Sequence, residues 1–206
     1  MKTGRVEAFS DGVIAILITV MVIELHKPAE PTWTALAEVL PVLLAYLLSF
    51  VYLGIYWNNH HHMLQAVSRV SGGVLWANLH LLFWLSLVPF TTAWMSEEGF
   101  ATVPTAVYGI VLLLAAVAYS VLQGTLLRAQ GPNSRLAAAI GRDRKGRFSP
   151  LLYAAGIALS FVNQWLGVAL YVLVALLWLV PDRRVERVLA QDGAADAVGQ
   201  PGDAAT

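Results

Sequence analysis

The sequence contains no cysteine and few charged residues. None of the 206 residues is cysteine, and Asp, Glu, Lys and Arg together make up 13% of the chain. The missing cysteine excludes disulfides, thiolate metal sites and cysteine nucleophiles. The chain is strongly apolar, because 58% of its residues are hydrophobic and the mean hydropathy is +0.65. A soluble domain of this size could not bury so many apolar side chains. The composition therefore predicts a membrane protein that crosses the bilayer several times.

Apolar runs mark the expected membrane spans. The clear runs cover residues 8–25, 35–57, 74–95 and 103–127. A further run, 150–180, is interrupted only by Asn163-Gln164. One spanning helix needs about 20 residues, so this run is long for one helix and short for two. The pattern leaves open a single overlong helix or two short helices that meet at the polar pair.

The placement of lysine and arginine favours six spans over five. With six spans and a cytoplasmic N-terminus, twelve basic residues lie inside and only Lys27 lies outside. With five spans, Arg183, Arg184 and Arg187 would lie outside, which leaves nine basic residues inside and four outside. Because cytoplasmic loops are enriched in basic residues, we expect an all-α protein with six transmembrane helices and both termini in the cytoplasm.

The C-terminal segment differs in composition from the rest of the chain. Residues 190–206 are small and polar and include glycine and proline. Such a segment cannot bury enough apolar surface to fold. We therefore expect residues 1–189 to form one six-span domain and residues 190–206 to be a disordered cytoplasmic tail.

A charged motif, Arg5-x-x-x-Phe9-Ser10-Asp11, leads directly into the first apolar run. Charged side chains at the mouth of a transmembrane helix are costly, so their presence indicates a role in function or assembly.

Four residues of this first helix are predicted to share one face. Gly12, Ile16, Thr19 and Ile23 follow the spacing i, i+4, i+7, i+11 of a helix with 3.6 residues per turn. The hydroxyl of Thr19 can bond back to the carbonyl of Ala15, which is a common structural role. The first helix alone therefore does not assign a function to this threonine.

Further polar residues fall at the cytoplasmic ends of the first three helices. Buried polar groups at this depth need partners, so we expect a network between the helices. Its candidate members are Arg5, Ser10 and Asp11 of the first helix, Asn58, Asn59, His60, His61 and His62 of the second, and Asn78 and His80 of the third.

Catalytic and metal sites are poorly supported by the same residues. Three consecutive histidines point about 100° apart on a helix, so His60, His61 and His62 cannot all reach one ion beside Asp11. Ser10 and Asp11 are adjacent in sequence and follow no nucleophile-elbow pattern. We therefore expect neither an enzyme nor a bound metal.

These motifs together resemble the transmembrane protein 175 family of potassium channels, in its prokaryotic, single-repeat form. The resemblance covers residues 5–92. It rests on Arg5-x-x-x-Phe9-Ser10-Asp11-Gly12 with Ile16, Thr19 and Glu24-Leu25, on Trp57-x-x-His60-His61, and on Asn78-Leu-x-x-Leu82-Phe83-x-x-x-Leu87-x-Pro89-Phe90.

The resemblance implies a homotetramer in the bacterial plasma membrane whose first helices line a central pore for K⁺. Ile16 would form the narrowest constriction, Ile23 would line the pore nearer its outer mouth, and Thr19 would contribute to K⁺ preference. No cofactor and no nucleic-acid partner is implied. The chain has no Thr-Val-Gly-Tyr-Gly segment, so a carbonyl filter is excluded. Ala15 stands where some relatives carry a hydroxyl, so only weak to moderate K⁺ selectivity is expected.

In the family, the inner polar residues hold the pore helix in place. The resemblance therefore implies that Arg5, Ser10, Asp11, Asn78 and either His60 or His61 are scaffold residues, not ion ligands.

Two other functions are compatible with a six-span chain. A proton-coupled secondary transporter could use Asp11 and His60 as a relay, although the inverted repeat typical of such proteins is not visible. A non-conducting membrane scaffold would pack the Gly12–Ile23 face and keep it dry.

Overall fold

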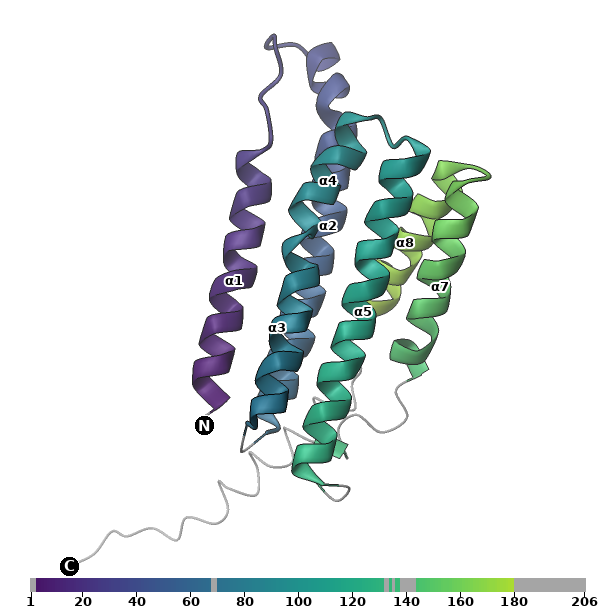
Figure 1. Cartoon of the computed structure of the whole chain (residues 1–206). Coiled ribbons are helices and arrows are strands. Elements are labelled where there is room, and N and C mark those ends of the chain that lie inside the picture. Colours follow the sequence, from purple (N-terminus) through teal and green to yellow (C-terminus); the bar gives the residue numbers. More distant parts are fainter. Residues whose placement is uncertain (1–2, 68–69, 132–133, 135, 138–143, 180–206) are drawn as a thin grey trace, which may run out of the picture.

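Helices form the regular structure of this protein (Figure 1). The computed structural model describes residues 3–67, 70–131, 134, 136–137 and 144–179, and it contains no strand within them. The expected tail, 190–206, lies outside the described residues. The helices are α1 (Thr3–Ile23), α2 (Trp33–Gln65), α3 (Gly72–Ser86), α4 (Val88–Glu97), α5 (Thr102–Gln130), α7 (Arg144–Ser160) and α8 (Gln164–Leu179).

Among the described residues, four helical segments are long and apolar enough to cross a membrane. They are α1, α2, the α3–α4 pair taken together, and α5. The helices α7 and α8 have 17 and 16 residues, which at 1.5 Å per residue gives each a length of about 25 Å. This length is a little less than the ~30 Å hydrocarbon thickness of a bilayer. The all-α prediction is confirmed for the described residues, whereas crossing by all six segments stays a prediction.

The ambiguous run 150–180 forms two helices. α7 ends at Ser160 and α8 begins at Gln164. Asn163 stabilises the start of α8, because its side-chain Oδ1 accepts a hydrogen bond of 2.9 Å from the backbone N–H of Trp165. An asparagine that caps the free N–H groups of a helix start favours a new helix at this point. The polar pair therefore marks a turn.

The third span is interrupted at Leu87, between α3 and α4. Pro89 lies in the first turn of α4, where its missing N–H costs nothing; within a continuous helix it would remove a hydrogen bond. The hydroxyls of Thr91 and Thr92 bond to the carbonyls of Leu87 and Val88. The hydroxyl bond of Thr91 adds to the backbone hydrogen bond that its own N–H already donates to the Leu87 carbonyl at 3.1 Å.

The first helix lies at one edge of the bundle, against α2, α3 and α4 (Figure 1). The side chains that it buries are Val6, Ser10, Ile14, Leu17 and Met21. Their spacing of three or four residues makes one continuous stripe on the helix. α1 is therefore attached to the bundle along one face only.

On the opposite side of the molecule, α5, α7 and α8 approach one another closely at glycine residues. Tyr171 of α8 is fully buried beside Gly156 of α7 and Gly109 of α5. A Cβ atom at Gly156 would lie 2.6 Å from Cε1 of Tyr171, closer than non-bonded carbons approach. Glycines at these positions therefore let the tyrosine ring fit between the helices.

Candidate functional site

The face of α1 that carries the predicted pore residues is exposed in the single chain. Gly12, Ile16, Thr19 and Ile23 are all exposed, and the side chains of Ile16 and Ile23 are 61% and 81% accessible. This face lies opposite the buried stripe of the same helix. A helix with one packed face and one open face carrying a hydroxyl can border lipid, another protein chain or a water-filled path.

Thr19 bonds to its own helix in a way that leaves its oxygen accessible. Its Oγ1 donates a hydrogen bond of 2.8 Å to the carbonyl oxygen of Ile16. The acceptor is three residues back, not the carbonyl of Ala15 four residues back. Because the hydroxyl proton is used in this bond, the lone pairs of Oγ1 can accept from water or coordinate a cation.

A buried chain of side-chain hydrogen bonds joins the inner ends of α1, α2 and α3. His60 Nε2 lies 2.7 Å from Asn78 Oδ1, Asn78 Nδ2 donates to Ser10 Oγ at 2.9 Å, and Ser10 donates to the Val6 carbonyl at 2.8 Å. All three side chains are at most 2% exposed. Three of the predicted scaffold residues are therefore in direct contact.

The direction of these hydrogen bonds shows which ring nitrogen of His60 carries the proton. The amide of Asn78 uses its NH₂ group toward Ser10, so its carbonyl oxygen faces His60 and Nε2 must carry the proton. His60 Nδ1 is buried and has no hydrogen-bond partner among the described residues. A second proton on Nδ1 would add a buried, unpaired donor, so the network uses the neutral imidazole.

Asp11 takes part in a separate contact nearer the surface. Its Oδ1 accepts a hydrogen bond of 3.0 Å from the indole Nε1 of Trp57. Asp11 and His60 share no hydrogen bond among the described residues, because the first faces Trp57 and the second faces Asn78. The geometry gives no direct proton path between the two residues proposed for the transporter alternative.

His61 points to a different partner from its neighbour His60. Its Nδ1 lies 2.7 Å from Oε1 of Glu7, a salt bridge whenever the imidazole is protonated. Its Nε2 lies 2.8 Å from Gln65 Nε2, and its ring stacks on Trp57 with centroids 5.9 Å apart. His60 is therefore the buried histidine, whereas His61 forms an outer contact between α1 and α2.

Arg5 is exposed at the start of α1. Within the described part of the chain its guanidinium makes no hydrogen bond or ion pair. Its place in the scaffold network stays a prediction.

Sequence reasoning missed several polar contacts. Glu7 and Trp57 bind His61 and Asp11, and a second buried network lies deeper in the bundle. In that network Ser49 contacts the hydroxyls of Thr92 and Tyr108 at 2.7 and 3.0 Å. Hydroxyl residues inside apolar runs were the available signal, because a polar group in a span requires a partner.

No cluster suited to a metal ion is present in the described residues. They hold no group of three or more His, Cys, Asp or Glu side chains placed to bind one ion. The divergence of His60 toward Asn78 and His61 toward Glu7 follows from their adjacent positions on a helix.

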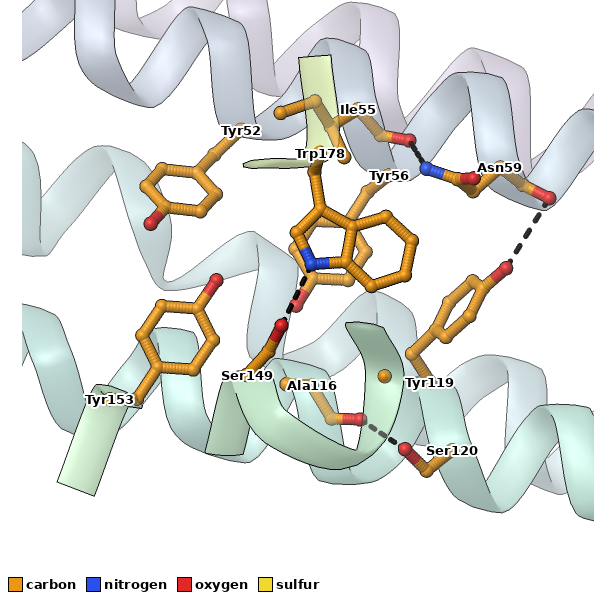
Figure 2. A pocket seen from close by; sticks show the side chains of 11 residues that line it. Tyr52, Ile55, Tyr56, Asn59, Ala116, Tyr119, Ser120, Ser149, Tyr153 and Trp178 are labelled. Carbon is orange, nitrogen blue, oxygen red and sulfur yellow. Dashed lines mark hydrogen bonds between the residues drawn. The ribbon is translucent and has the colours of Figure 1, made fainter. Parts of the chain in front are cut away.

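A cavity of about 40 Å³ lies apart from α1, among α2, α5, α7 and α8 (Figure 2). That volume fits a few water molecules. Five of its eleven lining residues are aromatic, and most of its polar groups are already hydrogen-bonded. Trp178 Nε1 donates to Ser149 Oγ at 2.8 Å, and the Asn59 amide donates to the carbonyl of Ile55 at 2.8 Å. The lining residues are Tyr52, Ile55, Tyr56, Asn59, Ala116, Tyr119, Ser120, Gly146, Ser149, Tyr153 and Trp178.

Comparisons with known proteins bear directly on α1 to α4. The family model of the endosomal/lysosomal potassium channel TMEM175 matches residues 5–89. This stretch contains the exposed face of α1 and all three members of the buried hydrogen-bond chain.

Relatives align over most of the chain. A potassium channel from Chryseobacterium sp. (strain P1-3) is 50% identical, covering 93% of this chain and all of that protein. A potassium channel from Streptomyces collinus is 35% identical, covering 85% of this chain and 90% of that protein. The crystal structure of a lysosomal potassium-selective channel TMEM175 homolog from Chamaesiphon minutus superposes with a TM-score of 0.74 at 32% identity, covering 86% of this chain and 96% of that one. The family and these relatives are ion channels and not enzymes, and the chain belongs to the TMEM175 family as a prokaryotic member.

Proposed function

We propose that this protein is a potassium-permeable channel with weak to moderate K⁺ selectivity, formed by four copies of the chain around a central pore. The observation that carries the proposal is the open face of α1, on which Ile16, Thr19 and Ile23 are exposed. Four such helices around an axis would enclose a path lined by aliphatic side chains and one ring of hydroxyls.

The aliphatic residues supply the constriction. Ile16 and Ile23 extend from the helix with little contact to their own chain, being 61% and 81% accessible. Rings of isoleucine narrow the path and repel water, and a narrow apolar path opens and closes by wetting and dewetting. Ile16 is the tighter gate in this proposal, and Ile23 lies nearer the outer mouth.

The hydroxyl of Thr19 supplies the K⁺ preference. Its proton is held by the Ile16 carbonyl at 2.8 Å, so its oxygen faces the path as an acceptor. Four such oxygens replace part of the hydration shell of a cation, and potassium gives up its shell more readily than sodium. One ring of neutral oxygens favours K⁺ only moderately.

The inner polar contacts keep the pore helix in position. Ser10, Asn78 and His60 hold α1 from its buried side, while Asp11 and His61 hold it near the surface through Trp57 and Glu7. These residues act as scaffold and do not contact the ion. In this proposal both termini are cytoplasmic, and the protein lies in the bacterial plasma membrane.

The first test is the reversal potential of purified protein in a planar bilayer with K⁺ on one side and Na⁺ on the other. A reversal toward the K⁺ equilibrium potential supports the proposal. A reversal near zero contradicts the selectivity, and the absence of current from a folded oligomer contradicts the channel itself.

Replacing Ile16 with Asn tests whether this residue forms the constriction. A ring of amides holds water where isoleucines exclude it, so the resting current is expected to rise several-fold. Val117→Asn is the matched control, since Val117 is an exposed aliphatic of α5 that the proposal places away from the pore. Equal currents from Ile16→Asn and the unmodified protein would contradict the proposed gate.

A further inference from the structure

Two polar side chains are exposed on otherwise apolar faces of α2 and α3, the two helices that pack against α1 near its inner end. Asn58 of α2 and His80 of α3 are both exposed. Asn58 makes no side-chain hydrogen bond to any described residue, and His80 bonds only within its own helix, to Trp84. Unpaired polar groups are unfavourable against lipid tails.

The contact with Trp84 shows which proton His80 carries. The indole N–H of Trp84 donates to His80 Nε2 at 3.0 Å. Indole nitrogen can only donate, so Nε2 is the acceptor and the proton of the neutral ring is on Nδ1. His80 therefore presents an unused N–H donor at the surface of the chain, and the carbonyl oxygen of Asn58 is an unused acceptor.

The two residues lie at one depth in the membrane. The hydrogen bond between His60 and Asn78 places these residues of α2 and α3 at the same level. Asn58 comes two residues before His60 on a helix that runs inward, and His80 comes two residues after Asn78 on a helix that runs outward. At a rise of 1.5 Å per residue, Asn58 and His80 therefore each lie about 3 Å nearer the bilayer centre than the His60–Asn78 pair.

Asn58 and His80 each lie two positions, about 200° round the helix, from the residues that join α2 to α3, His60 and Asn78, so they point away from that contact in opposite directions. In Figure 1, α1 is at one edge of the bundle, α3 and α4 are in front, and α2 is behind them. On α2, Asn58 continues the exposed leucine stripe, eleven residues after Leu47. On α3, His80 lies between the exposed aromatic residues Trp76 and Phe83.

We propose that each copy contacts its neighbour through these two faces, and that His80 of one copy donates a hydrogen bond from Nδ1 to the side-chain oxygen of Asn58 in the next. The inference rests on the proposed ring of four chains with α1 toward the axis. Rotation about an axis normal to the membrane preserves depth, so residues level in one chain stay level between neighbours. One boundary of each copy then supplies the acceptor and the other the donor, which is the head-to-tail contact that closes a ring.

Cysteine cross-linking tests this contact on a clean background, because the chain has no cysteine of its own. Copies carrying Asn58→Cys with one affinity tag are co-expressed with copies carrying His80→Cys and a different tag. A direct disulfide needs Cα atoms within about 7 Å, closer than two side chains joined by a hydrogen bond require, so the two cysteines are joined with a short bis-methanethiosulfonate reagent. We expect a band that contains both tags and disappears on reduction. The control pairs Asn58→Cys copies with Val117→Cys copies, whose exposed position on α5 should give no such band.

The oligomer and its current are measured on the same preparation. A conducting oligomer without the two-tag band contradicts the contact and leaves the channel standing. A non-conducting monomer contradicts the proposed function together with this inference.

A second measurement uses the hydrogen bond itself. His80→Leu and Asn58→Leu are each expected to lower the temperature at which the detergent-solubilised oligomer dissociates. The double variant should lose little more than either single variant, because each substitution removes the same hydrogen bond. His80→Gln keeps a donor and should retain most of the stability. Fully additive losses from the two leucine variants would contradict a direct contact.

Discussion

The His60 ring of α2 and the Asn78 amide of α3 meet inside the protein, with 2.7 Å between Nε2 and Oδ1. Because the same amide donates to Ser10 of α1, one asparagine connects three helices. Asn78 is thereby the side chain through which α1 is hydrogen-bonded to α3 and, through His60, to α2.

Replacing Asn78 with Leu should destabilise the protein more than its small change in volume suggests. The substitution leaves the His60 N–H without an acceptor in a buried position, at a cost of about 1–3 kcal/mol. The measurement is the thermal unfolding of the detergent-solubilised protein. The double variant His60→Phe/Asn78→Leu removes the unpaired donor and should recover part of the loss. An Asn78→Leu protein as stable as the unmodified chain would contradict this account of the network.

Replacing Gly109 with Ala should disturb the packing of α5 against α8. A Cβ atom at this position would lie 2.5 Å from Cζ of Tyr171, and overpacking of this kind costs about 1–3 kcal/mol. Gly124→Ala on the same helix is the control, because nothing lies within 4 Å of a Cβ there and alanine favours a helix over glycine. Thermal unfolding of the two variants should therefore shift in opposite directions; a loss of equal size in both would show that Tyr171 is not the cause.

Replacing Thr19 with Val should lower the preference for K⁺ and keep the shape of the helix. Valine matches threonine in volume but removes the oxygen that faces the proposed path, so the K⁺/Na⁺ permeability ratio should fall toward one, whereas Thr19→Ser should keep most of it. The measurement is the reversal potential under mixed-ion conditions. Thr125→Val is the control, since that hydroxyl also bonds to its own helix, at 2.7 Å from the Val121 carbonyl. An unchanged ratio in Thr19→Val would remove Thr19 from the selectivity mechanism.

External acid should reduce the current through Glu24, which follows the last residue of α1. Partial burial raises the pKa of this carboxyl above its ordinary value, and the negative charge of Glu97 adds to the effect. Glu24 therefore takes up a proton at a higher pH than an ordinary glutamate. As the external pH falls through this range, the outer mouth loses negative charge and attracts fewer cations.

Inward K⁺ current measured at low ionic strength, where screening is weakest, should fall on acidification. Glu24→Gln should have a lower current at neutral pH and a flatter pH dependence. Glu38→Gln, which alters another exposed carboxyl on the same side, should behave like the unmodified protein. A pH curve that is identical with and without Glu24 would contradict its role.

Hydropathy predicted the helices well where the signal is local, and less well at their ends. Apolar runs identify spans directly, because lipid selects for composition residue by residue. The sequence placed Asn58 to His62 on the second helix beyond its apolar run, and α2 continues three residues further, to Gln65. The length of the run 150–180 did not show whether it forms one helix or two. The hydrogen bond by which Asn163 caps the start of α8 explains why it forms two.

The sequence by itself determined which residues of α1 share the open face, because the helical period places Gly12, Ile16, Thr19 and Ile23 in line. It also determined that polar residues of three helices meet at one depth. Only the tertiary structure decided the partners, bringing His60 rather than His61 to Asn78 and Trp57 to Asp11. The reason is physical: each pairing depends on how a helix is rotated about its own axis, and that rotation is fixed by contacts between residues far apart in the chain.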